Sequence, residues 1–183
     1  MRAFVAIDIP DRVIDSLVAF QGELSATGGD LKLVERENLH FTVRFLGEIG
    51  DPQASEVLSR LGRLRLTKGA VEVRGTGAFP NPRRPRVVWA GVAHEGEGVI
   101  GPIAREVIGA LEGIGERDER PFQAHITLGR VRSFRNSREL GEFLAGQSER
   151  AFGVAELSEL KLKSSRLTPS GPVYSDIGVF HLE

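Results

Sequence analysis

The sequence contains no cysteine among its 183 residues, which excludes disulfide bonds, a thiolate nucleophile and a cysteine-ligated zinc site. It also lacks any uninterrupted apolar run as long as a membrane-spanning helix needs. The apolar stretch at 3–7 is bounded by Arg2 and Asp8 and is too short for a signal peptide. We therefore expect a cytoplasmic protein with no membrane contact.

The sequence also lacks an excess of positive or negative charge. The chain has 24 basic and 25 acidic residues and a formal net charge of -1, so it has no global attraction to polyanions, and any contact with nucleic acid must be local. Lysine is scarce, with four residues against 20 arginines. This bias suits phosphate recognition by guanidinium groups, but a general preference for arginine explains it equally well. The length and the 40% hydrophobic content are typical of one globular domain, 1–183, which we expect to be a monomer.

Two short stretches repeat one pattern, His40-Phe41-Thr42-Val43 and His125-Ile126-Thr127-Leu128. In an extended strand the histidine and the threonine of each stretch project from one face, and the apolar residues project from the other. A single histidine in an apolar strand is more often structural than catalytic. Two matched copies, in a chain with four histidines, predict two similar halves that each offer an imidazole and a hydroxyl to a shared cleft.

The surrounding hydrophobic pattern supports a duplication. Each half has the order strand, helix, His-Thr strand, helix, strand, which predicts pseudo-twofold symmetry between halves at roughly 1–80 and 84–183. The expected strands are 3–9, 31–34, 39–46, 70–73, 87–92, 122–131, 155–162 and 173–182. The expected helices are 11–24, capped by Asp11, and segments around 51–64, 99–111 and 140–144. The glycine- and proline-rich segment 75–86 is expected to connect the halves.

Two facing histidines suit the cleavage of a phosphodiester. One imidazole can accept a proton from water while the other gives a proton to the leaving oxygen, from opposite sides of phosphorus. The hydroxyls of Thr42 and Thr127 can donate hydrogen bonds to the non-bridging oxygens. The symmetry alone does not decide which histidine is the acid.

Two arginines are candidate phosphate contacts. By strict alternation Arg44 shares the face of His40 and Thr42, whereas Arg130 lies opposite His125 unless a bulge at Gly129 redirects it. A solvated surface position is an equally good explanation for either arginine. Neither motif has a third ligand nearby, so we expect no metal ion. The G-x-G-x-x-G pattern at 96–101 is not followed by the acidic strand end of a dinucleotide site, so we expect no cofactor.

Together with the two motifs, several flanking segments resemble the two-histidine phosphoesterase superfamily and, within it, the RNA 2',3'-cyclic phosphodiesterases, also called 2'-5' RNA ligases. These segments are 38–47, 79–80, 85–91, 120–122, 164–167 and 171–174. The resemblance spans nearly the whole chain. It implies an α+β fold of two antiparallel-sheet lobes that face a central cleft, with helices outside and no metal ion. It also implies that His40 is the proton donor and His125 the proton acceptor.

The expected function is metal-independent hydrolysis of 2',3'-cyclic phosphate at RNA ends or on small nucleotides, which leaves a 2'-phosphate. Reverse 2'-5' ligation is permitted by microscopic reversibility. The alternative is a module that binds nucleotides or RNA ends in the same cleft without turnover. The chain departs from the family at Leu31-Lys32-Leu33-Val34, where members often carry an aromatic residue, so the resemblance implies no base stacking from this segment.

Overall fold

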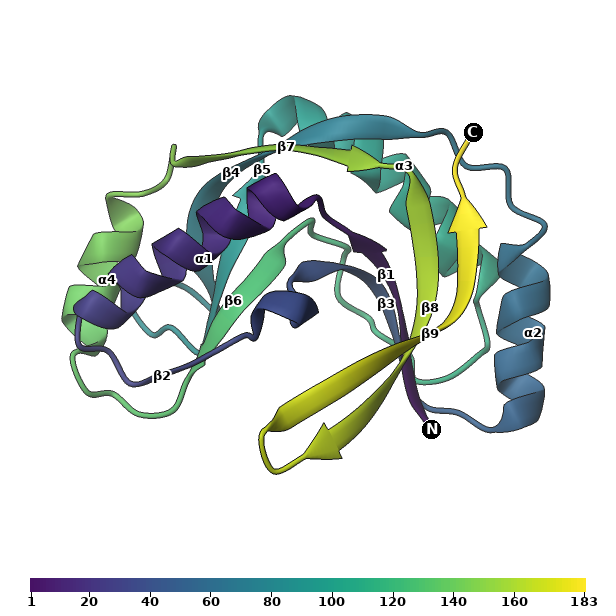
Figure 1. The fold of residues 1–183 in the computed structure, drawn as a ribbon, viewed down its shortest axis with the longest axis horizontal. Helices are drawn as coiled ribbons and strands as arrows, with labels where there is room; N and C mark the ends of the chain where they lie inside the picture. Colours follow the sequence, from purple (N-terminus) through teal and green to yellow (C-terminus); the bar gives the residue numbers. More distant parts are fainter.

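The computed structural model describes residues 1–183 as an α+β fold with one curled antiparallel sheet of nine strands and four α-helices (Figure 1). The sheet order is β7-β4-β5-β6-β3-β1-β8-β9, and β2 pairs with β6. The strands are β1 (Arg2–Asp8), β2 (Leu31–Leu33), β3 (His40–Glu48), β4 (Gly69–Phe79), β5 (Val87–Val92), β6 (Ile126–Val131), β7 (Ala151–Leu157), β8 (Glu159–Thr168) and β9 (Gly171–His181). The helices are α1 (Asp11–Ala26), α2 (Asp51–Leu61), α3 (His94–Ala110) and α4 (Ser137–Ala145), with a 3-10 turn at Arg36–Asn38.

The strands fall into two groups that meet at one point. In one lobe β3, β1, β8 and β9 are neighbours, and in the other β6, β5, β4 and β7 are neighbours. The lobes join where Phe41 of β3 pairs with Ile126 of β6. The predicted α+β fold with antiparallel strands is confirmed, although the strands form one continuous curled sheet. None of the helices is long and apolar enough to cross a membrane.

The helices cover the buried face of the sheet. The buried side chains of α1 include Val13, Leu17, Phe20 and Leu24, which recur at helical spacing, and α1 packs against β7 and β6. Helix α3 packs against β4 and β3, α4 packs against β4, and α2 packs against α3.

Several sequence-based boundaries were wrong for identifiable reasons. Asp11 is the first residue of α1 and not its cap, because Pro10 holds the cap position. Residues 75–79 continue β4, so the connection between the halves is limited to 80–86. Gly77 serves close packing there, since a Cβ at that position would clash with the indole ring of Trp89. The expected strand 155–162 is divided at Ser158 between β7 and β8.

Candidate functional site

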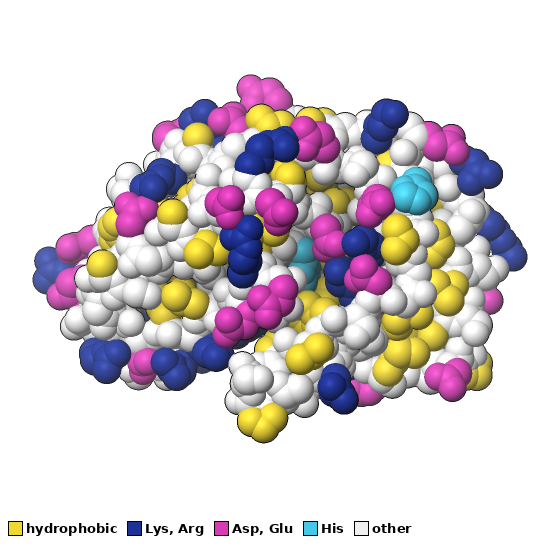
Figure 2. All heavy atoms as spheres, viewed as in Figure 1, with side chains coloured by type: hydrophobic (Ala, Val, Ile, Leu, Met, Phe, Trp, Pro, Cys, Tyr) yellow, Lys and Arg dark blue, Asp and Glu magenta, His cyan; other side chains and the backbone are white.

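The two His-Thr motifs meet around the bridge between the lobes. Because Phe41 and Ile126 are direct partners, antiparallel register sets His40 against Thr127 and Thr42 against His125. The side chains of Phe41 and Ile126 are fully buried on the core face, so the four polar side chains project from the opposite face. His125 itself precedes β6, which begins at Ile126, whereas a strand had been expected from 122. Figure 2 shows a histidine set back between the two halves of the molecule, with acidic and basic side chains around it.

Aromatic rings hold the imidazole of His40. The ring stacks on Phe4 at a centroid distance of 5.1 Å and meets the edge of Tyr174 at 5.6 Å. Its Nε2 lies 3.1 Å from Oγ1 of Thr42, a hydrogen bond in which either group can donate. Burial lowers the pKa of His40 to about 4, with help from the charge of Lys163 and partial opposition from Asp8. His40 is therefore neutral at neutral pH in the free protein.

The second imidazole is held differently. His125 meets the edge of Phe79 at 5.0 Å and lies 6.4 Å from the ring of Trp89. Its Nδ1 is 2.7 Å from the carbonyl oxygen of Gln123. Because a carbonyl can only accept, Nδ1 carries the proton, and in the neutral ring Nε2 is free to accept another. Burial lowers the pKa of His125, the Gln123 carbonyl opposes this shift, and the nearby arginines Arg120 and Arg130 add to it.

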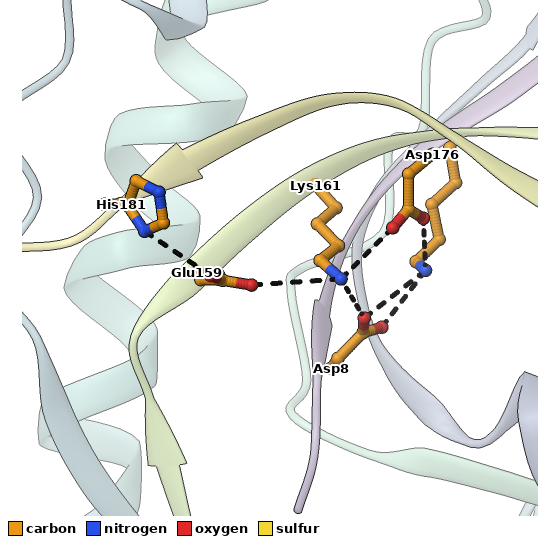
Figure 3. Close-up of polar contacts among 6 residues, drawn as sticks. Asp8, Glu159, Lys161, Asp176 and His181 are labelled. Carbon is orange, nitrogen blue, oxygen red and sulfur yellow. Dashed lines mark hydrogen bonds and ion pairs between the residues drawn. The ribbon is translucent and has the colours of Figure 1, made fainter.

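Asp8, Lys161, Lys163 and Asp176 form a network of four charged side chains (Figure 3). Lys161 Nζ is 2.7 Å from Asp8 and 3.1 Å from Asp176, and Lys163 Nζ is 2.8 Å from Asp176 and 3.2 Å from Asp8. Asp8 is the direct cross-strand partner of His40. Burial alone would raise the pKa of both aspartates, but the two lysines outweigh it and lower the pKa of each.

The sequence-based reasoning missed this network. The only signal in the sequence was the alternation of Lys161 and Lys163 with buried Leu160 and Leu162 in one strand.

Beta-bulges decide where the two candidate arginines point. On β3 the partners of Val5 and Ala6 are Arg44 and Thr42, so Val43 is an extra residue. Arg44 thereby shares the core face with Val5, and the expectation that it shares the face of His40 was wrong. Its side chain is 9% exposed, its Nη2 donates to the carbonyl oxygen of Glu116 at 3.0 Å, and its Nε has no partner.

The corresponding bulge on β6 has the opposite effect on Arg130. The partners of Val88 and Trp89 are Gly129 and Thr127, so Leu128 is the extra residue. Arg130 therefore returns to the face of Thr127, is exposed, and adds a positive charge near His125 and Tyr174. The carbonyl oxygen of Leu128 accepts bonds from the backbone of Val34 and from Nε2 of buried Gln21, both at 2.9 Å. The sequence-based reasoning did not single out Gln21.

Three positively charged side chains act on Tyr174. Burial raises the pKa of its hydroxyl, and the charges of Arg130, Arg2 and Lys163 oppose this shift. These cations come from both lobes, so an anion between them would be attracted from both sides. No group of three His, Cys, Asp or Glu side chains in the structure is arranged to hold a metal ion. The remaining histidines, His94 and His181, are exposed.

Comparison with known proteins gives three concordant results. A family model described as LigT like phosphoesterase matches residues 7–89 and 93–174. The RNA 2',3'-cyclic phosphodiesterase of Archaeoglobus fulgidus is 41% identical over 98% of this chain and 99% of its own length. The protein of the same name from Methanothermobacter thermautotrophicus is 36% identical over 100% of this chain and 99% of its own length.

Solved structures agree with these sequence matches. The crystal structure of TT0787 of Thermus thermophilus superposes with a TM-score of 0.80 at 32% identity, covering 100% of this chain and 98% of that chain. The E. coli LigT complexed with 3'-AMP superposes with a TM-score of 0.77 over 99% of this chain and 97% of that chain, and at 22% identity this likeness shows the fold alone. The chain, over nearly its full length, belongs to the LigT-like phosphoesterase family.

Proposed function

We propose that this protein hydrolyses the 2',3'-cyclic phosphodiester of an RNA end or a nucleotide to a 2'-phosphomonoester by paired histidine acid-base catalysis. The observation that carries the proposal is the register around the Phe41–Ile126 bridge, which sets one imidazole and one hydroxyl from each lobe on one face. The names of the full-length relatives support the same reaction class. We also propose that a monomer suffices, since one chain supplies both His-Thr pairs.

The proposed reaction is a single in-line displacement. Nε2 of His125 takes a proton from water, the water oxygen bonds to phosphorus, the bond from phosphorus to O3' breaks, and His40 gives its proton to O3'. Thr42, Thr127 and Arg130 donate to the non-bridging oxygens, where charge accumulates. Each well-placed donor of this kind contributes roughly 3 kcal/mol in the transition state. With a 5'-hydroxyl in place of water, the same residues would form a 2'-5' phosphodiester: the 5'-oxygen bonds to phosphorus, the bond to O3' breaks, and abundant water competes with this ligation.

The roles of His40 as acid and His125 as base follow the family resemblance. The charge state of the free protein determines when His40 can acquire the proton that it gives. His40 is neutral before substrate binds, because its pKa is about 4. An anionic phosphate beside the ring favours the protonated form, so we propose that His40 gains its proton together with the substrate. His125 already has the tautomer that a base requires, with its Nδ1 hydrogen directed at Gln123.

The direct test is incubation with 2',3'-cyclic AMP in excess chelator, followed by separation of the product isomers. The expected product is 2'-AMP. Loss of activity on chelation would contradict the metal-free reaction, and 3'-AMP would contradict the direction of opening. Absence of any product would favour the alternative, a module that binds nucleotides or RNA ends without turnover. Replacing His40 or His125 by alanine should abolish turnover without altering the circular dichroism spectrum.

A substrate with sulfur in place of O3' separates the roles of the two histidines. A thiolate leaves without a proton, so His40→Ala should retain most of the wild-type rate on this substrate, whereas His125→Ala should remain inactive. The reverse pattern would assign the acid to His125.

A further inference from the structure

An exposed aromatic ring lies on the same face of β3 as His40. Phe45 is 53% exposed, although it is part of a central strand of the sheet. Its cross-strand partner is Phe4, and Phe4 stacks on His40, so all three rings project from one face. The β-bulge that turns Arg44 into the core is what returns Phe45 to this face.

The ring of Phe45 extends an aromatic wall. Phe4 lies 6.0 Å from Phe45 and 5.1 Å from His40, and Tyr174 meets Phe4 at 4.9 Å. The wall therefore runs from Tyr174, beside His40, through Phe4 to the exposed ring of Phe45. Phe4 is 3% exposed and supports the wall from within, so Phe45 offers the open surface.

Phe45 on β3 and Arg130 on β6 occupy corresponding positions in the two lobes. Phe45 and Arg130 are each the third residue after the threonine of their motif, and each is the first to return to the cleft face after a bulge. One lobe thus presents an aromatic ring where the other presents a guanidinium. A nucleotide has the same asymmetry, with a flat base at one end and an anionic phosphate at the other.

We propose that Phe45 is the stacking surface for the base of the terminal nucleotide, with Phe4 and Tyr174 as the wall behind it. The inference rests on the proposed function, which sets the phosphate between the histidines with O3' towards His40 and hence the ribose on the His40 lobe. A ring without hydrogen-bonding groups accepts purines and pyrimidines alike, since every base has a π-face. The subsite would therefore tolerate either class of base and favour purines through their larger stacking area.

The kinetic test compares wild type with Phe45→Ala and Phe45→Trp on 2',3'-cyclic AMP. Loss of one base-stacking contact should raise KM about tenfold and leave kcat unchanged, because stacking contributes equally to ground and transition states. Phe45→Trp should keep KM near the wild-type value. The matched control is Phe134→Ala, which removes a 77% exposed ring outside the wall and should alter neither constant. An unchanged KM in Phe45→Ala would overturn the inference.

Calorimetric binding of 2'-AMP and of inorganic phosphate keeps the two proposals separate. Phe45→Ala should bind 2'-AMP about tenfold more weakly and phosphate as wild type does. Equal weakening for both ligands, or none for 2'-AMP, would refute the base subsite. If wild type fails to cleave 2',3'-cyclic AMP and the selective loss for 2'-AMP is still observed, the base subsite stands and the proposed catalysis falls.

Discussion

Replacing Lys163 by methionine should raise the pKa of His40. The present value of about 4, against an ordinary 6.5, has burial as its largest cause and the charge of Lys163 as its second, with Asp8 opposing both. The depression corresponds to roughly 3 kcal/mol against the protonated ring. Methionine keeps most of the buried stem and removes the charge, so the pKa should rise by about one unit and stay below the ordinary value, because burial persists. Asp8→Asn should lower the pKa of His40 further, because the charge of Asp8 raises this pKa.

The assay is a proton NMR titration of the His40 ring, with its signal assigned as the one that is lost in His40→Ala. Lys161→Met is the matched control, since Lys161 belongs to the same network but its charge is not among the named causes of the His40 pKa shift, so a smaller change is expected. A wild-type midpoint between pH 6 and 7, or a midpoint that Lys163→Met leaves unmoved, would refute the electrostatic explanation.

The same shift predicts how the stability of the protein depends on pH. The unfolded chain protonates His40 near pH 6.5, and the folded protein does so only near pH 4. Between these values the unfolded state binds more protons, so the free energy of unfolding falls as the pH falls, by about 3 kcal/mol across the window from this residue. Urea denaturation midpoints measured at intervals from pH 7 to pH 4 would reveal the loss, which Lys163→Met should reduce.

Three further substitutions test other parts of the site. Gln21→Leu removes the Nε2 bonds to the carbonyl oxygens of Val34 and Leu128, and should lower the urea-derived free energy of unfolding by about 1–3 kcal/mol; an unaltered midpoint would mean that water replaces the amide. Arg130→Met should raise KM for a cyclic nucleotide about tenfold and make KM less sensitive to salt concentration. An unchanged KM would mean that Arg130 does not contact phosphate. Arg44→Met should lower the thermal midpoint and leave KM unchanged, because this side chain faces the core, and a marked rise in KM would contradict the bulge on β3.

The face from which the histidines and threonines project could be predicted because it depends on local order alone, although His125 itself lies just before β6. Alternation assigns His40 and Thr42 to one face in any extended strand, and the second motif repeats the same arrangement. Composition and hydrophobic period also gave the four helices and most strands. The single bridge between the lobes was not predictable, because it joins Phe41 and Ile126 across a large separation in sequence.

The faces of the two arginines could not be predicted for a different reason. A bulge is a property of a strand and its partner together, and nothing in Val43-Arg44 by itself specifies an extra residue. Gly129 raised a bulge on β6 as one alternative, but only the pairing with β5 decides that the bulge forms. The charged network has the same origin, since Asp8 and Lys161 become neighbours only after β1 and β8 pair. Gly77 was assigned to the connection between the halves, whereas it lies in β4 and makes room for the indole ring of Trp89.

The position of β8 has a consequence for the synthesis of the protein. Strand β1 begins at the second residue of the chain and lies between β3 and β8, and β8 begins only at Glu159 (Figure 1). A nascent chain on the ribosome therefore carries an apolar strand with one unpaired edge until β8 has emerged. The strands of the lobe with His125 lie in the middle of the chain, apart from the short strand β2, which pairs with β6. All of them are synthesised before β8. The lobe with His40 is thus completed after the lobe with His125, and a chain released before β8 emerges would retain both histidines with only half of the cleft assembled.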